Sequence, residues 1–128
     1  MKAIIDTHTF IWIDQDPAKL SPAALAHFND PTCEILLSVA SIWEIVLKLA
    51  IGKLALSGEV DQVIQDIQAQ NPLQILAIAY RHVLAVRSLP SIHKDPFDRM
   101  LVAQAQVEQA VLLSCDPMIA KYPVTVIW

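Results

Sequence analysis

The chain has 128 residues, of which 55% are hydrophobic and 17% charged, and its formal net charge is −4. A chain of this length and composition buries its own core, which excludes an intrinsically disordered segment and a fold that depends on disulfides. The negative charge argues weakly against an autonomous nucleic-acid binder, although four of the nine Lys and Arg residues fall between residues 81 and 99, where they could form one basic face.

The chain opens with a strand pattern followed by a helix pattern. Residues 2–6, KAIID, form a short apolar run that ends on a carboxylate, as a buried parallel strand does. In LSPAALAHFND, Ser21 is the expected N-cap and Pro22 the first helical residue, and the helix is predicted to stop at residues 29–31.

The same alternation continues through the middle of the chain. EILLSV, residues 34–39, predicts a second buried strand, and the helix after it is expected to open at Ser41 and to end near Gly52. Residues 57–71 carry Val and Ile on one stripe with acids and glutamines opposite, which predicts an amphipathic helix.

The second half repeats the pattern and completes one domain. An apolar run (73–78) precedes a helix pattern (79–89), and the helix DPFDRMLVAQAQVEQ (95–109) precedes the strands VLLSCD and YPVTVIW. No repeat, low-complexity tract or interdomain linker interrupts them. Strands that alternate with helices imply a parallel sheet covered on both faces.

The sequence shows neither a membrane segment nor a secretion signal. Glu44 and Lys48 interrupt the longest apolar region, so no membrane span is expected. The N-terminus lacks the apolar region and cleavage site of a signal peptide, which predicts a cytoplasmic protein. Cys33 and Cys115 are therefore expected to be reduced thiols, and their spacing matches no metal-ligand pattern.

Four acidic residues fall where four strand or helix units meet the same edge of the predicted sheet. Asp6 ends the first strand, Glu44 lies early in the helix after the second, Asp98 lies in the first turn of the DPFD helix, and Asp116 ends VLLSCD. Ligands of open α/β sheets bind beyond the carboxyl ends of the strands. All four acids are expected to project to that edge.

Each acid taken alone also has a structural explanation. Ser41 and Glu44 have the spacing of a capping box, and Glu44 can pair with Lys48 at i,i+4. Asp95 and Asp98 both suit the amino end of a helix. Capping does not explain why so many acids gather at one edge, because clustered like charges disfavour one another.

A divalent cation removes that repulsion. Mg²⁺ prefers oxygen ligands and is usually held by one or two carboxylates together with substrate phosphate, and Mn²⁺ also fits such a rim. The four acids, without a cysteine or histidine cluster, therefore predict a carboxylate metal site.

The segments that carry these acids resemble a known family. IIDTHTFIW, SVASIWEIVLK, HKDPFDRMLVAQA and LLSCDPMIAKYPVTVIW together resemble the PIN domain, specifically the VapC-type toxins of bacterial toxin–antitoxin pairs. The resemblance runs from the first strand to the C-terminus and implies a single PIN domain over residues 1–128. The implied fold is a PIN-like three-layer α/β/α structure with a mainly parallel sheet of about five short strands.

The resemblance also implies an activity and partners. The implied function is a Mg²⁺- or Mn²⁺-dependent endoribonuclease toxin that hydrolyses RNA phosphodiester bonds by metal-activated water and leaves 5′-phosphate and 3′-hydroxyl ends. A homodimer is expected, inhibited by a VapB-type antitoxin in a heterotetramer or larger assembly. The high hydrophobic content of the chain agrees with such an assembly. Apolar surface on the helices between residues 20 and 70 is expected to be covered by a twin subunit or an antitoxin.

The resemblance makes Asp6, Glu44, Asp98 and Asp116 the catalytic and metal-binding quartet. Asp6 and Asp98 are expected to contact metal directly, and Glu44 to act as a ligand or to accept the proton of the attacking water. Ser114 stands where the family usually has threonine, which keeps the hydroxyl.

Other residues are candidates for supporting roles. Many relatives have a further acid after the fourth, where this chain has Pro117 and Met118, so Asp95 is a candidate supplementary acid. Ser41 and Ser114 could hydrogen-bond carboxylates or metal-bound waters, Lys48 could orient Glu44 or meet a phosphate, and Arg99 could touch RNA. Trp12 and Trp43 are expected to belong to the core rather than to stack on bases.

Three other functions remain open from sequence. A housekeeping PIN nuclease would use the same acids, and a PIN fold without activity would only bind a partner, for which four clustered acids are unnecessary. A receiver-like phosphoacceptor module would need an adjacent acidic pair after the first strand, where this chain has DTHT.

Overall fold

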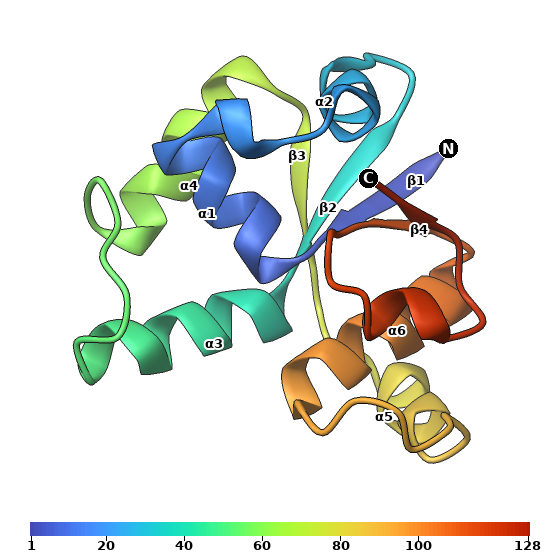
Figure 1. The fold of residues 1–128 in the computed structure, drawn as a ribbon. Helices are drawn as coiled ribbons and strands as arrows, with labels where there is room; N and C mark the ends of the chain where they lie inside the picture. Colours follow the sequence, from blue (N-terminus) through green and yellow to red (C-terminus); the bar gives the residue numbers. More distant parts are fainter.

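The computed structural model describes residues 1–128 and has a central five-stranded sheet with helices on both faces (Figure 1). The elements in chain order are β1 (Lys2–Ile5), α1 (Thr7–Gln15), the 3-10 helix η1 (Pro17–Lys19), α2 (Pro22–Asn29), β2 (Glu34–Ser38), α3 (Val39–Ala50), α4 (Val60–Gln70), β3 (Leu73–Leu76), α5 (Tyr80–Val86), α6 (Pro96–Glu108), β4 (Val111–Leu113), the 3-10 helix η2 (Ile119–Lys121) and β5 (Val126–Ile127).

The sheet is parallel throughout and has the strand order β3-β2-β1-β4-β5. From β1 the chain moves outward to β2 and β3, and then returns to place β4 on the other side of β1. Ile4 of β1 pairs with Leu36 of β2 and with Leu112 of β4. The direction of winding therefore changes between β1 and β4, which is where open α/β sheets bind ligands.

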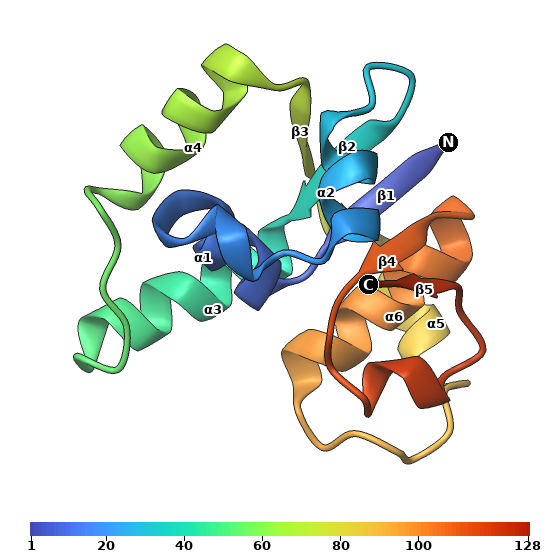
Figure 2. The same ribbon diagram turned by 45° about the horizontal axis from the view of Figure 1, so that its top comes forward.

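Alternating side chains of the strands build one core on each face of the sheet. Ala3 and Ile5 point into a cluster with α1, α2, α3 and α4, which includes Phe10 and Ile45. Ile4 points the other way, into a cluster dominated by α6 and η2. Figure 2 shows α1 and α4 on one side of the strands and α5 and α6 on the other. The expected three-layer α/β/α fold with a parallel sheet is confirmed.

Two predicted helix starts are confirmed by their caps. The Ser21 hydroxyl accepts a hydrogen bond from the Ala24 amide at 3.1 Å, with Pro22 at the first helical position. The Asp95 carboxylate accepts one from the Phe97 amide at 2.8 Å. Both signals are local, because the cap and its acceptor geometry are set within one helical turn.

The expected capping box at Ser41 and Glu44 is wrong. Helix α3 begins at Val39, and its N-cap is Ser38, whose hydroxyl accepts from the Ala40 amide at 3.0 Å. Ser38 also donates to Gln104 at 2.5 Å, so a contact with α6 fixes the helix start. The predicted strand also runs one residue too far, because Val39 is the first residue of the helix.

The expectation that Trp43 lies in the core is also wrong, because 57% of its surface is exposed. Its ring packs edge-on against Phe97 at the start of α6, with centroids 5.1 Å apart and planes at 81°. Helix α3 thus presents an aromatic side chain to solvent at the side of the sheet where α6 begins.

None of the helices combines the length and apolar character that crossing a membrane requires.

Candidate metal centre

Asp6 is a buried acid of the candidate site. It follows β1, caps α1 and is 3% exposed. One carboxylate oxygen accepts from the Thr9 amide at 2.8 Å and the Thr9 hydroxyl at 2.6 Å, and the other accepts from the Ser114 hydroxyl at 2.6 Å. Charge-assisted hydrogen bonds of this kind hold a buried carboxylate in one orientation.

Glu44 projects from α3 toward the amino end of α1. Its side chain is 5% exposed, and each of its oxygens has one partner. The Thr7 hydroxyl donates to one oxygen at 2.7 Å, and the Lys48 ammonium lies 2.7 Å from the other. The expected i,i+4 pair with Lys48 is therefore present, and it fixes the orientation of the Glu44 carboxylate.

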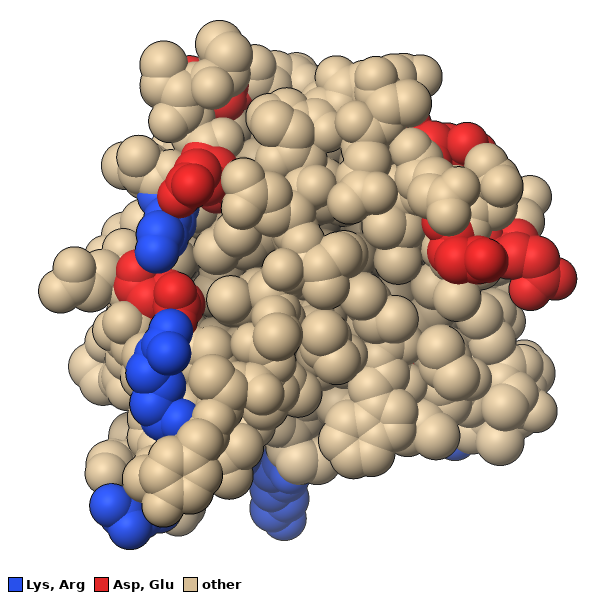
Figure 3. Space-filling model, turned by 180° about the vertical axis from the view of Figure 1, so that it is seen from behind, with Lys and Arg blue, Asp and Glu red and all other residues tan.

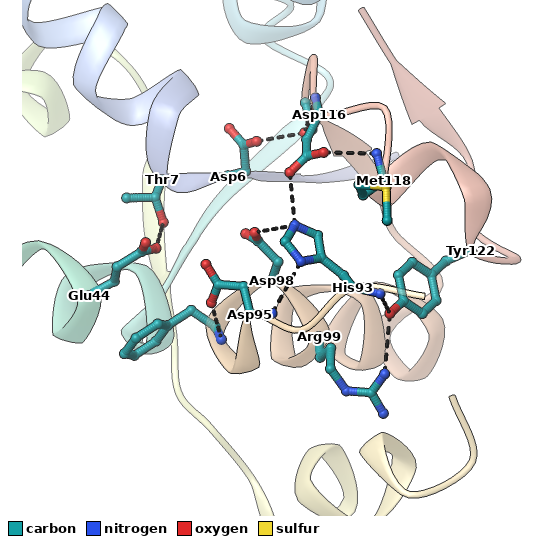
Figure 4. Close-up of polar contacts among 12 residues, drawn as sticks. Asp6, Thr7, Glu44, His93, Asp95, Asp98, Arg99, Asp116, Met118 and Tyr122 are labelled. Carbon is teal, nitrogen blue, oxygen red and sulfur yellow. Dashed lines mark hydrogen bonds and ion pairs between the residues drawn. The ribbon is translucent and has the colours of Figure 1, made fainter. Parts of the chain in front are cut away.

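Asp98 lies in the first turn of α6 with its side chain 15% exposed. Burial, together with the negative charges of Asp95, Glu44 and Asp6, raises the pKa of Asp98 from 3.8 to about 7, against a lowering effect of His93. All these carboxylates act on Asp98 through space, so the sequence-distant acids share one electrostatic environment. Figure 4 shows them around a common space.

Asp116 follows β4 and joins Asp98 through a histidine. The Met118 amide donates to one Asp116 oxygen at 2.8 Å, which turns the chain and aims the carboxylate. Nε2 of His93 lies 3.1 Å from Asp116 Oδ2 and 3.1 Å from Asp98 Oδ2. These three side chains place possible ligand atoms within 4.8 Å of one another.

The backbone around His93 decides which of its nitrogens carries a proton. Nδ1 accepts from the Asp95 amide at 3.1 Å. Since that nitrogen is an acceptor, the proton of a neutral ring sits on Nε2, which then donates to the carboxylates. His93 in this position is thus a donor that holds Asp98 and Asp116 together, rather than a third metal ligand.

The donor set fits a hard divalent cation. Four carboxylates from β1, α3, α6 and the segment after β4 converge, and Lys48 and His93 are the only basic side chains paired with them. Besides burial, the negative charges of Asp95, Glu44 and Asp6 raise the pKa of Asp98, which indicates excess negative charge at this edge of the sheet. Oxygen donors with excess negative charge suit Mg²⁺ or Mn²⁺.

Of the residues predicted to support the site, some contact the clustered acids and others do not. The Ser114 hydroxyl contacts Asp6, and Asp95 adds its charge to the cluster while it caps α6. Ser41 is fully buried, and its hydroxyl has no hydrogen-bond partner. The Arg99 guanidinium contacts none of the acids; it donates to the Pro90 carbonyl at 2.9 Å and to the Tyr122 hydroxyl at 3.2 Å.

Sequence reasoning missed how three neighbours position the acids. Thr7 binds Glu44 across 37 residues, and His93 binds Asp116 across 23. The Tyr122 hydroxyl accepts from the His93 amide at 2.8 Å, which anchors the loop before α6 (Figure 4). His93 had one usable signal, its place two residues before the Asp95 cap, but its orientation depends on contacts that only the fold creates.

The family model described as PIN domain matches residues 3–124. No curated protein matches the sequence. Among solved structures, a chain of VapBC2 from Rickettsia felis, crystallised with a DNA fragment from its promoter, superposes with a TM-score of 0.68 at 15% identity, over 98% of this chain and 97% of that chain. A chain of VapBC-1 from nontypeable Haemophilus influenzae gives 0.59 at 16% identity, over 98% and 96%. At these identities the two structures show a shared fold.

Proposed function

Because the chain belongs to the PIN domain family, whose members are generally nucleases, we propose that it is a metal-dependent endoribonuclease of the VapC toxin type. The observation that carries the proposal is the group of acids at the point where the winding of the sheet reverses. Asp98 and Asp116 place possible ligand atoms within 4.8 Å of each other, and the charges of Glu44 and Asp6 act on Asp98. The likeness in fold to chains of two VapBC complexes supports the toxin assignment.

In this proposal Asp6, Asp98 and Asp116 hold Mg²⁺ or Mn²⁺, with Glu44 beside them. The chemistry that such a cation supplies when bound is a lowered pKa of water and stabilisation of charge on the phosphodiester. Ser114 and His93 act on the acids themselves, since their hydrogen bonds fix the Asp6 and Asp116 oxygens.

Glu44 is the proposed acceptor of the proton from the attacking water. Its contacts with Thr7 and Lys48 hold the carboxylate in one orientation. Water attacks phosphorus, its proton moves to Glu44, and the bond from phosphorus to the 3′ oxygen breaks. The 3′ oxygen takes a proton from solvent, which leaves 5′-phosphate and 3′-hydroxyl ends.

Exposed apolar side chains support a partner. Large hydrophobic residues in α3 and directly after it reach solvent, among them Val46, Leu47 and Ile51, each 46% exposed or more. Figure 3 shows a broad face without charged side chains between acidic groups on one side and a column of mixed charges on the other. We propose that a second copy of the chain and a VapB-type antitoxin cover these exposed hydrophobic residues.

Cleavage of a mixed, structured RNA pool by the purified, antitoxin-free chain tests the proposal. The chain is incubated with Mg²⁺, Mn²⁺ or EDTA, beside Asp98→Asn and the control Glu59→Gln, which changes an exposed acid outside the cluster. Cutting should require metal, fall at least about 100-fold in Asp98→Asn and persist in Glu59→Gln. Cutting that survives both EDTA and Asp98→Asn would refute the metal mechanism. Absence of cutting by a folded wild type across many RNAs would favour a module that only binds partners.

A further inference from the structure

A pocket lies beside the carboxylate cluster but is not part of it. It encloses about 580 Å³ between α3, α5 and the start of α6. None of the four clustered acids lines it. Phe97 of this pocket is the immediate neighbour of Asp98, and Lys94 is the neighbour of Asp95. The pocket therefore adjoins the start of α6, the helix that carries Asp98.

Two aromatic rings form one wall of the pocket. Trp43 is 57% exposed, and Phe97 supports it edge-on at 5.1 Å. An indole held by a second ring offers a flat apolar surface that needs no rearrangement to receive another flat group. Base–aromatic stacking uses such surfaces, and it tolerates any base sequence because every base has a π-face.

The polar part of the pocket is entirely basic. Arg87, Lys94 and Arg99 line it, and no aspartate or glutamate does, although the chain as a whole has a net charge of −4. Arg99 is committed to the Pro90 and Tyr122 contacts. Arg87 and Lys94 are exposed, and neither takes part in any ion pair. Two uncommitted cations beside an apolar wall complement a polyanion with flat apolar bases.

We propose that this pocket binds an unpaired nucleobase of the RNA substrate by stacking on Trp43, with Arg87 and Lys94 meeting the flanking phosphates. The proposal rests on the proposed ribonuclease function and names its substrate class, which is single-stranded or loop RNA. A base inside an A-form duplex cannot present its face to the pocket, because it is stacked on both sides.

A second copy of the chain fits the pocket less well. A twofold interface centred on it would place the same surface opposite itself, and the cations of one copy would face those of the other. Apolar residues farther along the chain, such as Leu47 in α3 and Ile51 directly after it, remain free to contact a twin subunit.

The first arm of the test measures binding of a fluorescently labelled single-stranded RNA in EDTA, where no cutting interferes. Trp43→Ala should weaken binding roughly 5- to 150-fold, the range of one stacked base, and Trp43→Phe should keep most of the affinity. Leu47→Ala is the matched control, since Leu47 is an exposed apolar residue of α3 outside the pocket, and it should bind within about twofold of wild type. A duplex of the same sequence should bind equally to wild type and Trp43→Ala.

The second arm tests the cations through salt dependence. Arg87→Gln should reduce the slope of log affinity against log salt by about 0.7. Lys53→Gln is the control, because Lys53 is exposed, unpaired and outside the pocket, and it should leave the slope unchanged.

The outcomes separate this proposal from the proposed function. Unchanged RNA affinity in Trp43→Ala, while the wild type still cuts RNA with metal, would overturn the pocket alone. RNA binding that depends on Trp43 without any cutting by the wild type would overturn the nuclease alone. Light scattering tests the alternative occupant: loss in Trp43→Ala of a dimer that the wild type forms would identify the pocket as an interface between copies and overturn base binding.

Discussion

Ser114 Oγ lies 2.6 Å from Asp6 Oδ2, so a hydroxyl after β4 donates to the carboxylate after β1. The same hydroxyl accepts from the Asp116 amide at 3.1 Å. One buried side chain thereby couples the two strand ends at which the winding of the sheet reverses. The Ser114 hydroxyl thus connects the Asp6 side chain to the backbone of Asp116. From the sequence alone, only the presence of a hydroxyl at position 114 could be noted.

Ser114→Ala should destabilise the metal-free protein by roughly 1–3 kcal/mol, because the buried Asp6 carboxylate loses a charge-assisted donor. Ser114→Thr keeps the hydroxyl and should recover most of that loss. Urea denaturation in EDTA measures both variants against wild type. Equal losses in the Ala and Thr variants would show that the hydroxyl itself does not stabilise the site.

Ser38 and Ser41 should respond oppositely to removal of their hydroxyls. Ser38→Ala loses the cap of α3 and the contact with Gln104, and should cost roughly 1–3 kcal/mol. Ser41→Ala removes a buried hydroxyl that has no partner, and should be neutral or stabilising. The two free energies of unfolding, measured by urea denaturation, decide this. A larger loss in Ser41→Ala would mean that its hydroxyl has a partner in solution.

The metal-free protein should lose stability as Asp98 ionises. The pKa of Asp98 is raised to about 7 in the folded protein, above the ordinary 3.8, so its protonated form favours folding. That contribution is fully present below about pH 4 and is lost as pH rises through about 7. Asp98→Asn stays neutral, so in EDTA its Tm should exceed that of wild type by a few degrees more at pH 8 than at pH 5.5, at roughly 4 °C per kcal/mol. A Tm difference that does not change with pH would contradict the raised pKa of Asp98.

Glu108 lies outside the site, and its contribution to stability should show the opposite pH dependence. Hydrogen bonds from His82 and then Arg81 lower the pKa of Glu108 from 4.5 to about 2, and so link α5 to the end of α6. A lowered pKa contributes stability above about pH 4.5 that is lost as pH falls toward 2. Glu108→Gln should therefore cost roughly 1–3 kcal/mol at pH 7 and less at pH 3, by urea denaturation. An equal cost at both pH values would assign the effect to packing.

Local signals explain which parts of the fold were predictable. Ser21 and Asp95 mark their helix starts within one turn, and short continuous apolar runs identify the strands. Helix α1 was missed because its sequence, THTFIWIDQ, is rich in β-branched and aromatic residues that favour helices weakly, and Asp6 acts as both strand end and cap. The start of α3 was placed three residues late because the choice between Ser38 and Ser41 depends on Gln104, far along the chain.

The candidate site was predictable only in its acids. Parallel strands bring their carboxyl ends to one edge, so the positions of Asp6 and Asp116 follow from topology. The role of His93 as a bridge follows from the Asp95 amide and from side-chain orientation, which no spacing encodes. Trp43 was assigned to the core because apolar residues surround it in sequence, but those neighbours include the exposed row of α3.

The most direct test of the metal centre is a calorimetric titration of Mn²⁺ into the antitoxin-free chain at pH 8, where Asp98 is ionised. Wild type and Glu59→Gln should bind Mn²⁺ with the same affinity, and Asp98→Asn should bind at least about tenfold more weakly, because it removes one charged oxygen ligand. Wild-type binding no tighter than that of Asp98→Asn would contradict the account, since Asp98 would then take no part in holding a cation.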